Sequence, residues 1–101
     1  MADTISIGPI GTLIRELRHR SALSQQGLAH RLATVSGNDA ITRSQVARWE
    51  HGTRIPSPYW RRWIGDVLDV PIPFLDTAAA VAQFVRAAPD IAERLHDRET
   101  R

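Results

Sequence analysis

The fold of this chain is decided by two stretches, Leu23-Ser-Gln-Gln-Gly-Leu-Ala-His-Arg-Leu32 and Thr42-Arg-Ser-Gln-Val-Ala-Arg-Trp-Glu-His-Gly52. The first contains Ser24, whose hydroxyl oxygen is a good N-cap for a helix. The second ends on Gly52, and glycine is the residue most often found just beyond a helix C-terminus. The two stretches predict two helices, joined by a loop over Thr34–Ile41 that we expect from its polar and glycine-containing composition.

Apolar spacing predicts further helices on both sides of this pair. Ile10, Leu13, Ile14 and Leu17 recur at helical spacing, while charged side chains lie off that stripe. The dipeptide Ser57-Pro58 combines an N-cap with a first-turn proline, which is typical of a helix start. The expected helices run from Ile10 to about Ser21, over Gln25–Ala33, from Thr42 to Gly52, from Ser57 through Leu68, and from Asp76 or Thr77 to about Asp97.

The sequence therefore predicts an all-α protein. We expect a compact four- to five-helix bundle that contains a helix-turn-helix and has a C-terminal helical extension. Its expected parts are a flexible N-terminal arm over residues 1–8, a helix-turn-helix domain over residues 9–75 and the extension over residues 76–101. The side chains expected to face the core are those of Ile10, Leu13, Ile14, Leu17, Leu28, Ala29, Leu32, Val46, Trp49, Trp60, Trp63, Ile64, Val67 and Leu68.

Composition argues against several classes of protein. The sequence has no run of 18 or more apolar residues, so we expect no membrane span. Its first ten residues lack the basic-then-apolar order of a signal peptide. The absence of cysteine removes disulfides and cysteine-based zinc sites. Together these features favour a cytoplasmic protein.

Basic charge is concentrated in the first two thirds of the chain. Residues 10–63 carry nine arginines against three acidic residues, a net charge of +6, whereas residues 64–101 carry a net charge of −3. All 13 basic side chains are arginine, whose guanidinium group makes bidentate contacts to phosphate and guanine. A GC-rich genome would also favour arginine over lysine. The asymmetry points to a polyanion bound by the first two thirds of the chain.

The helix after Thr42 has the two faces that a DNA-reading helix needs. At about 100° per residue, Val46 and Trp49 point to the same side. A DNA major groove, about 12 Å wide, admits one helix, and small residues on the outer face let the backbone approach the bases. The outer face carries Arg43, Ser44, Ala47, Arg48 and His51.

Followed by Pro56-Ser57, the two stretches resemble the Cro/phage-repressor helix-turn-helix family, also called the xenobiotic response element family. The likeness covers residues 10–75, and the order of Leu-Ser-Gln, Trp-Glu-x-Gly and Pro-Ser is fairly specific. It implies sequence-specific binding of duplex DNA for transcriptional regulation. The recognition helix would be about Thr42–His51, lying in the major groove.

The resemblance also implies roles for individual side chains. Gln25 would contact phosphate and reach the first base pair, and Arg54 would contact the DNA backbone. Arg18 and Glu50 fall where the family often has a structural ion pair, so neither is expected to read bases. The residues expected to bind DNA are Gln25, Arg43, Ser44, Gln45, Ala47, Arg48 and Arg54.

The loop Thr34–Ile41 departs from the family, which usually has a turn of a few residues between these helices. The longer loop would either change the angle of the recognition helix or add backbone contacts through Ser36 or Asn38. Asp39 argues against a loop that lies flat on phosphate. The full set of expected backbone contacts is Ser24, Ser36, Asn38, Thr42, His51 and Thr53.

Several of these side chains also have a simpler interpretation. Arg43 and Arg48 fit a solvated helix face, and Gln25 fits a surface cap. The tryptophans fit core spacing, and the four histidines lack the spacing of a metal site. Because the sequence has neither a nucleophile elbow nor a glycine-rich phosphate loop, we expect no enzyme activity, no metal and no cofactor.

The last helical region carries a seam of apolar residues that we expect to make the protein a homodimer. Its spacing of 4, 3, 4 and 3 residues is that of a coiled-coil contact. Pro89 lies inside the seam and would kink or split the helix. A segment folded back over Trp60 or Trp63 is the competing interpretation. The seam residues are Val81, Val85, Ala88, Ala92 and Leu95.

The sequence leaves two alternatives to a transcription regulator open. An antitoxin of the same fold would bind DNA and also neutralise a toxin through its C-terminal segment, and a neighbouring toxin gene would support it. A protein-interaction module would use the fold without DNA. The net charge of +6 over residues 10–63 argues against that module.

Overall fold

The computed structural model describes the backbone of residues 8–99 and the side chains of residues 8–87. The expected N-terminal arm therefore lies outside the described residues, except for Gly8. No strand occurs within residues 8–99, so the expected all-α fold is confirmed. The helices are α1 (Ile10–Arg20), α2 (Gln25–Ser36), α3 (Arg43–His51), α4 (Pro58–Leu68) and α5 (Ile72–Glu99).

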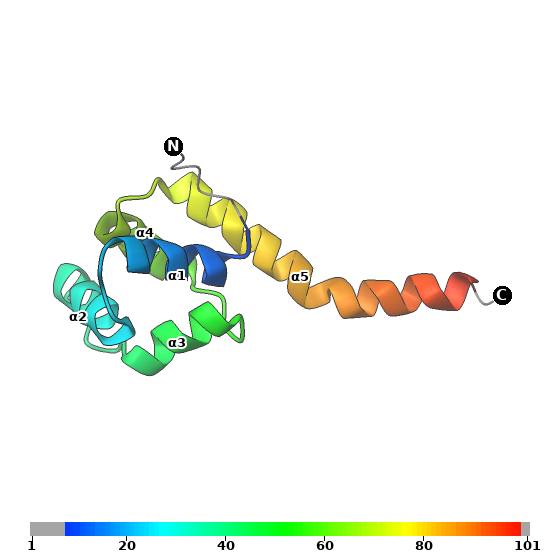
Figure 1. The fold of residues 1–101 in the computed structure, drawn as a ribbon, viewed down its shortest axis with the longest axis horizontal. Coiled ribbons are helices and arrows are strands. Elements are labelled where there is room, and N and C mark those ends of the chain that lie inside the picture. The colour runs from blue at the N-terminus through cyan, green and yellow to red at the C-terminus, as the bar shows by residue number, and fades with distance from the viewer. Residues whose placement is uncertain (1–7, 100–101) are drawn as a thin grey trace.

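The helices α1 to α4 gather around one core, and α5 joins them only at its beginning. Figure 1 shows the start of α5 lying against this group and its remainder running far away from it. The most extensive contacts of α5 within the described chain are with α1 and α4. The bundle with a C-terminal helical extension is thus the architecture of the chain.

The core forms where the apolar stripes of the five helices meet. The α1 stripe is buried as its spacing predicts, and Trp49 of α3 is 1% exposed. Trp60, Trp63 and Val67 of α4 are only partly buried, packed against the core from outside. The buried apolar side chains are Ile10, Leu13, Ile14, Leu17, Leu28, Ala29, Leu32, Ile41, Val46, Trp49, Ile64, Leu68, Val70, Leu75, Ala78, Ala79 and Ala82.

The helices α1 and α3 cross in close contact at Gly11. A Cβ atom at this position would collide with the carbonyl oxygen of Trp49 and lie 3.0 Å from that of Glu50. Real Cβ atoms do not approach backbone oxygen so closely, so the crossing requires glycine. The same crossing sets the position of α3 against the side of α1 that carries Arg18.

Side-chain caps determine where three of the helices begin. The hydroxyl oxygens of Ser24, Thr42 and Ser57 accept hydrogen bonds from backbone N–H groups in the first turns of α2, α3 and α4. Gly37 and Gly52 follow α2 and α3 with φ angles of 69° and 81°. Glycine adopts this left-handed conformation without strain, because it has no Cβ atom. The expected starts of these three helices are confirmed.

The expected loop Thr34–Ile41 is wrong, because α2 extends to Ser36. The hydroxyl groups of Thr34 and Ser36 donate hydrogen bonds to the carbonyl groups four residues earlier, at 3.0 and 2.6 Å. These polar side chains are satisfied on the helix itself, so they do not end it. The connection to α3 is the shorter segment 37–42.

The expected cap of the last helix, at Asp76 or Thr77, is also wrong. α5 begins at Ile72. Pro73 lies in its first turn, where a backbone N–H has no helical partner and a proline is tolerated. Asp76 instead accepts a hydrogen bond from Arg61 Nε at 2.9 Å. The first turns of α5 therefore belong to the core.

Beyond Ala82, α5 leaves the core. Phe84 and Val85 are 65% and 50% exposed. The helix stays continuous through Pro89 and changes direction partway along its length (Figure 1). The missing N–H of a proline accounts for such a bend. The seam residues whose side chains lie outside the described part are Ala88, Ala92 and Leu95.

Candidate nucleic-acid interface

One face of α3 is held in the core and the other is open. Val46 and Trp49 are 0% and 1% exposed, so the helix cannot rotate about its axis without losing its packing. α3 forms the lower edge of the molecule in Figure 1, with no other helix beyond it. Its outer face presents the exposed Arg43, Ser44, Arg48 and His51 and the half-buried Gln45 and Ala47.

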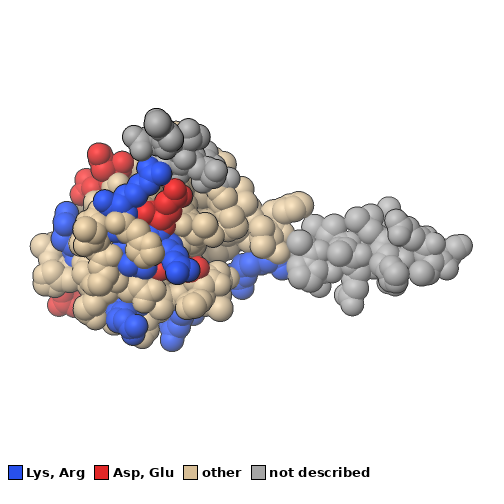
Figure 2. All heavy atoms as spheres, in the orientation of Figure 1, with Lys and Arg blue, Asp and Glu red and all other residues tan. Residues whose placement is uncertain are grey.

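Arginine side chains gather at this edge. Figure 2 shows blue side chains projecting beneath α3 and beneath the nearer part of α5. Within α3, Arg48 Nη1 donates a hydrogen bond to Gln45 Oε1 at 3.4 Å. The two side chains therefore lie side by side on the outer face, where a bound partner would meet both.

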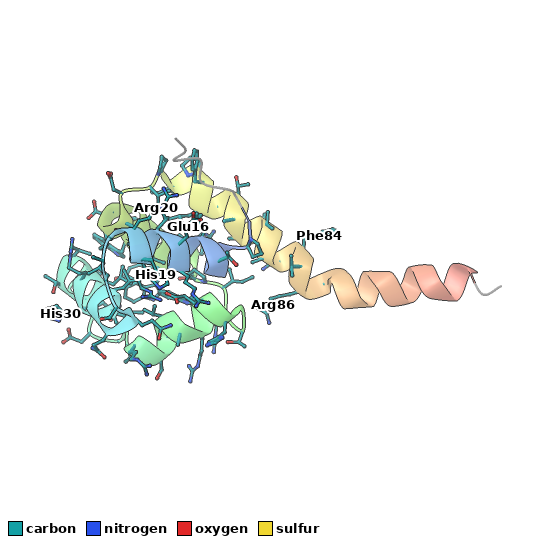
Figure 3. The ribbon with its side chains drawn as sticks, viewed as in Figure 1. Glu16, His19, Arg20, His30, Phe84 and Arg86 are labelled. Carbon is teal, nitrogen blue, oxygen red and sulfur yellow. The ribbon has the colours of Figure 1, made fainter. Side chains whose placement is uncertain are left out.

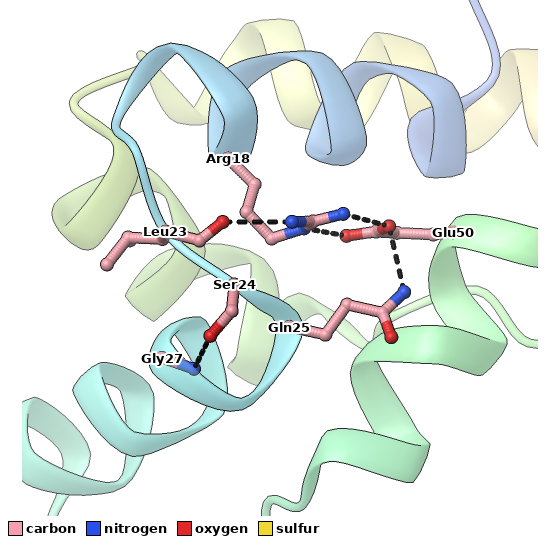
Figure 4. Close-up of polar contacts among 6 residues, drawn as sticks. All are labelled: Arg18, Leu23, Ser24, Gln25, Gly27 and Glu50. Atoms are coloured by element: carbon pink, nitrogen blue, oxygen red, sulfur yellow. Dashed lines mark hydrogen bonds and ion pairs between the residues drawn. The ribbon is translucent and has the colours of Figure 1, made fainter.

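Behind this face, Glu50 of α3 receives hydrogen bonds from α1 and α2 (Figure 4). Arg18 Nε donates to Glu50 Oε2 at 2.6 Å, and Arg18 Nη2 donates to Oε1 at 2.9 Å. Gln25 Nε2 donates to the same Oε1 at 3.1 Å. The side chains of Arg18 and Glu50 are 9% and 4% exposed. The expected Arg18–Glu50 ion pair is therefore confirmed, and it joins three helices.

The charge state of this pair follows from its surroundings. Burial raises the pKa of the Glu50 carboxyl group, but hydrogen bonds from Arg18 and Gln25 and the charges of Arg18 and Arg15 outweigh it. The pKa of Glu50 consequently lies below its ordinary value. The hydrogen bond to Glu50 raises the pKa of the Arg18 guanidinium group. Both groups stay charged at neutral pH, so the Arg18–Glu50 ion pair persists.

Glu50 also orients the beginning of α2. Gln25 donates one amide hydrogen to Glu50, and this bond keeps the Gln25 side chain beside α3. Ser24 Oγ accepts from the backbone N–H of Gly27 at 2.9 Å, and the hydroxyl hydrogen of a capping serine remains able to donate. The N-terminal end of a helix attracts anions through its free N–H groups and dipole. The N-terminal end of α2 and the neighbouring part of α3 thus form one surface.

The C-terminal end of α3 is wrapped by the segment that follows it. The carbonyl oxygen of Arg48 accepts hydrogen bonds from the backbone N–H groups of Thr53 and Arg54, at 3.1 and 3.3 Å. It also accepts one from the Thr53 hydroxyl at 3.2 Å. These bonds place the exposed Arg54 directly beside the last turn of α3.

Two expected backbone contacts have a local structural role. Ser36 Oγ accepts from the backbone N–H of Asn38 at 3.1 Å, and Asn38 Oδ1 accepts from that of Ala40 at 2.9 Å. These bonds build the turn between α2 and α3. The hydroxyl group of Ser36 and the side-chain oxygen of Asn38 therefore bond within the protein.

Two arginines beside the interface are absent from the sequence-based set. Arg15 of α1 lines a pocket of about 150 Å³ together with Gln25, Glu50 and His51. Arg86 of α5 lines another pocket with Arg54. Helical spacing places Arg15 off the buried stripe of α1, so its exposure could be predicted from the sequence. The position of Arg86 depends on how α5 packs against α1, which no local pattern reveals.

Comparisons with protein-family models, curated proteins and solved structures found no match. Among the described residues, no helix combines the length and apolar character needed to cross a membrane. The features that bear on function are therefore the geometry of α2, α3 and the segments beside them.

Proposed function

We propose that this protein is a helix-turn-helix transcription regulator of the Cro/phage-repressor type, which binds duplex DNA with α3 in the major groove. The observation that carries the proposal is the outer face of α3. Arg43 and Arg48 are exposed there, on a helix held in place by the buried Val46 and Trp49. Long donors on a rigid helix suit bidentate contacts to guanine O6 and N7.

Contacts in the proposed complex divide into positioning and reading. Gln25 at the beginning of α2, beside Glu50, and Arg54, beside the last turn of α3, would contact phosphates. Arg43 and Arg48 on the outer face would read bases. The hydrogen bond to Glu50 holds the Gln25 side chain in place. This division supports DNA binding over a general protein-interaction module, and it requires neither metal nor cofactor.

The test is binding to random-sequence duplex DNA, followed by selection of the bound sequences. The logarithm of the affinity should fall linearly with the logarithm of the salt concentration, by about 0.9 units for each phosphate contacted. With several contacts, affinity drops steeply between about 50 and 200 mM salt. A salt-independent affinity, or selection that enriches no sequence, would contradict the proposal.

A homodimer is the second part of the proposal. Phe84 and Val85 expose apolar surface on α5 beyond the core, which a second copy of the chain would cover. Two copies on a palindrome would place their half-sites about 10–10.5 base pairs apart, or a multiple of that. The protein would act in the cytoplasm.

Sedimentation of the intact chain at tens of micromolar concentration tests the dimer. We expect a dimer for the unchanged protein and a monomer after replacement of Phe84 and Val85 by serine. Val35→Ser is the matched control, because Val35 is 38% exposed on α2, away from α5. A monomeric unchanged protein, on and off DNA, would exclude the dimer.

A further inference from the structure

Arg86 lies on α5, outside the helix-turn-helix, yet beside the end of α3. Figure 3 shows its side chain beneath α5, on the side where α3 lies. Arg86 and Arg54 both line a pocket of about 260 Å³ whose wall includes His51 and Gly52 from the end of α3. Both arginines are exposed. One arginine from α5 and one from the segment after α3 thus line the same pocket next to the proposed recognition helix.

The packing of α5 puts Arg86 in this place. Ala82, which is 6% exposed, faces the core one helical turn earlier, and residues four apart share a helix face. Arg86 therefore points in the same direction as Ala82, about 6 Å further along the axis. Ile55, from the segment between α3 and α4, lines a neighbouring pocket together with Arg86. Arg86 therefore lies on a helix, one turn beyond the buried Ala82, and not on a loop.

The charge balance at this pocket favours an anion. Glu50 is the acidic residue in its lining, and its oxygens already accept hydrogen bonds from Arg18 and Gln25. The charges of Arg54 and Arg86, which line the same pocket, are therefore not neutralised by that carboxylate. Two like charges close to one pocket repel each other, and an anion bound beside both relieves the repulsion.

We propose that Arg86 and Arg54 together hold the DNA backbone beyond the recognition helix, so that α5 takes part in DNA binding. The inference rests on the proposed function. A DNA phosphate is the anion proposed, because both arginines line a pocket at the end of the helix that the proposed function places in the major groove. The Arg86 side chain projects from α5 on the side where α3 lies (Figure 3). Guanidinium groups bind phosphate oxygens in a bidentate manner.

The experiment measures the salt dependence of affinity for a random-sequence duplex, since phosphate contacts do not depend on base sequence. Arg86→Gln and Arg54→Gln should each reduce the slope by about one unit, and the double variant by about two. Arg86→Lys should keep the slope, because it keeps the charge. The control is Arg20→Gln. Arg20 is exposed and lies at the opposite end of α1 from the pocket wall. The slope of affinity against salt should therefore be the same for Arg20→Gln as for the unchanged protein.

The outcomes separate this inference from the proposed function. An unchanged slope for Arg86→Gln, beside a reduced slope for Arg54→Gln, would overturn the role of α5. An equal reduction for Arg20→Gln would also overturn it, because net charge alone would then explain the effect. Altered sedimentation of Arg86→Gln with an unchanged slope would assign the residue to dimer contacts instead. If the unchanged protein does not bind the duplex, the proposed function itself fails.

Discussion

Glu50→Gln is expected to lower the free energy of unfolding by roughly 3 kcal/mol, the lower end of the range for removing one charge from a buried pair. The variant keeps the shape of the side chain. It leaves the guanidinium group of Arg18, on a side chain 9% exposed, without its counter-charge. The lower end applies because both residues border a pocket that opens to solvent. Chemical denaturation at pH 7 measures the change.

Glu16→Gln is the matched control for this prediction. Glu16 pairs with Arg20 at 3.3 Å, but the two side chains are 38% and 41% exposed. Its loss should stay within about 0.5 kcal/mol, as for other exposed pairs on one helix. Replacing both Arg18 and Glu50 by methionine should recover much of the stability, because no charge is then left buried. Equal losses for the two glutamate variants would contradict a structural role of Glu50.

The same variant should change the response to acid. The pKa of Glu50 is lower in the folded protein than in the unfolded chain, where a glutamate titrates near about 4.3. Its contribution to stability is therefore complete above that pH and is lost as the pH falls through the folded-state value. Glu50→Gln should lose less stability than the unchanged protein between about pH 5 and pH 3. Parallel curves for the two proteins would show that Glu50 is not the responsible group.

The beginnings of α2, α3 and α4 could be predicted from the sequence because capping is local. A hydroxyl oxygen and the N–H group it accepts from are three residues apart, as for Ser24 and Gly27. The α1 stripe was equally predictable, since four apolar side chains at helical spacing need a common core. Local information sufficed wherever the deciding interaction spans one helical turn.

The C-terminal end of α2 and the beginning of α5 could not be placed by composition. Thr34 and Ser36 are residue types common in loops, but their hydroxyl groups bond back to the helix that contains them. Pro73 is a helix breaker in a helix interior and is tolerated in the first turn, where α5 places it. In both cases the residue type is compatible with two structures, and its position within the helix decides between them.

The candidate site was predictable in its parts but not in its assembly. The outer face of α3 follows from helical spacing alone. The contact of Arg18 with Glu50 spans 32 residues, and only the resemblance to a known family pointed to it. Arg86 was missed because its place beside Arg54 depends on the packing of Ala82 and its neighbours against the bundle. Long-range packing of this kind leaves no local pattern in the sequence.

Arg48→Ala is expected to weaken binding to the selected DNA site by about 1–3 kcal/mol, which corresponds to a roughly 5- to 150-fold loss of affinity, and to relax the base preference at one position. Arg48 is exposed near the middle of the outer face, with its guanidinium group beside Gln45. Because its contact would be to a base, binding to random-sequence DNA should fall much less. Competition between the selected and a scrambled duplex at one salt concentration measures the difference.

Arg48→Lys and Arg54→Ala complete this experiment. Lysine keeps the charge of Arg48 but lacks the planar fork that pairs with guanine O6 and N7, so non-specific affinity should persist while base preference falls. Arg54→Ala should weaken the selected and the scrambled duplex equally, because Arg54 lies after the helix and would contact the backbone. Equal loss on both duplexes for Arg48→Ala would move Arg48 to the phosphate contacts. Base reading would then fall to Arg43 and Ser44 at the beginning of α3.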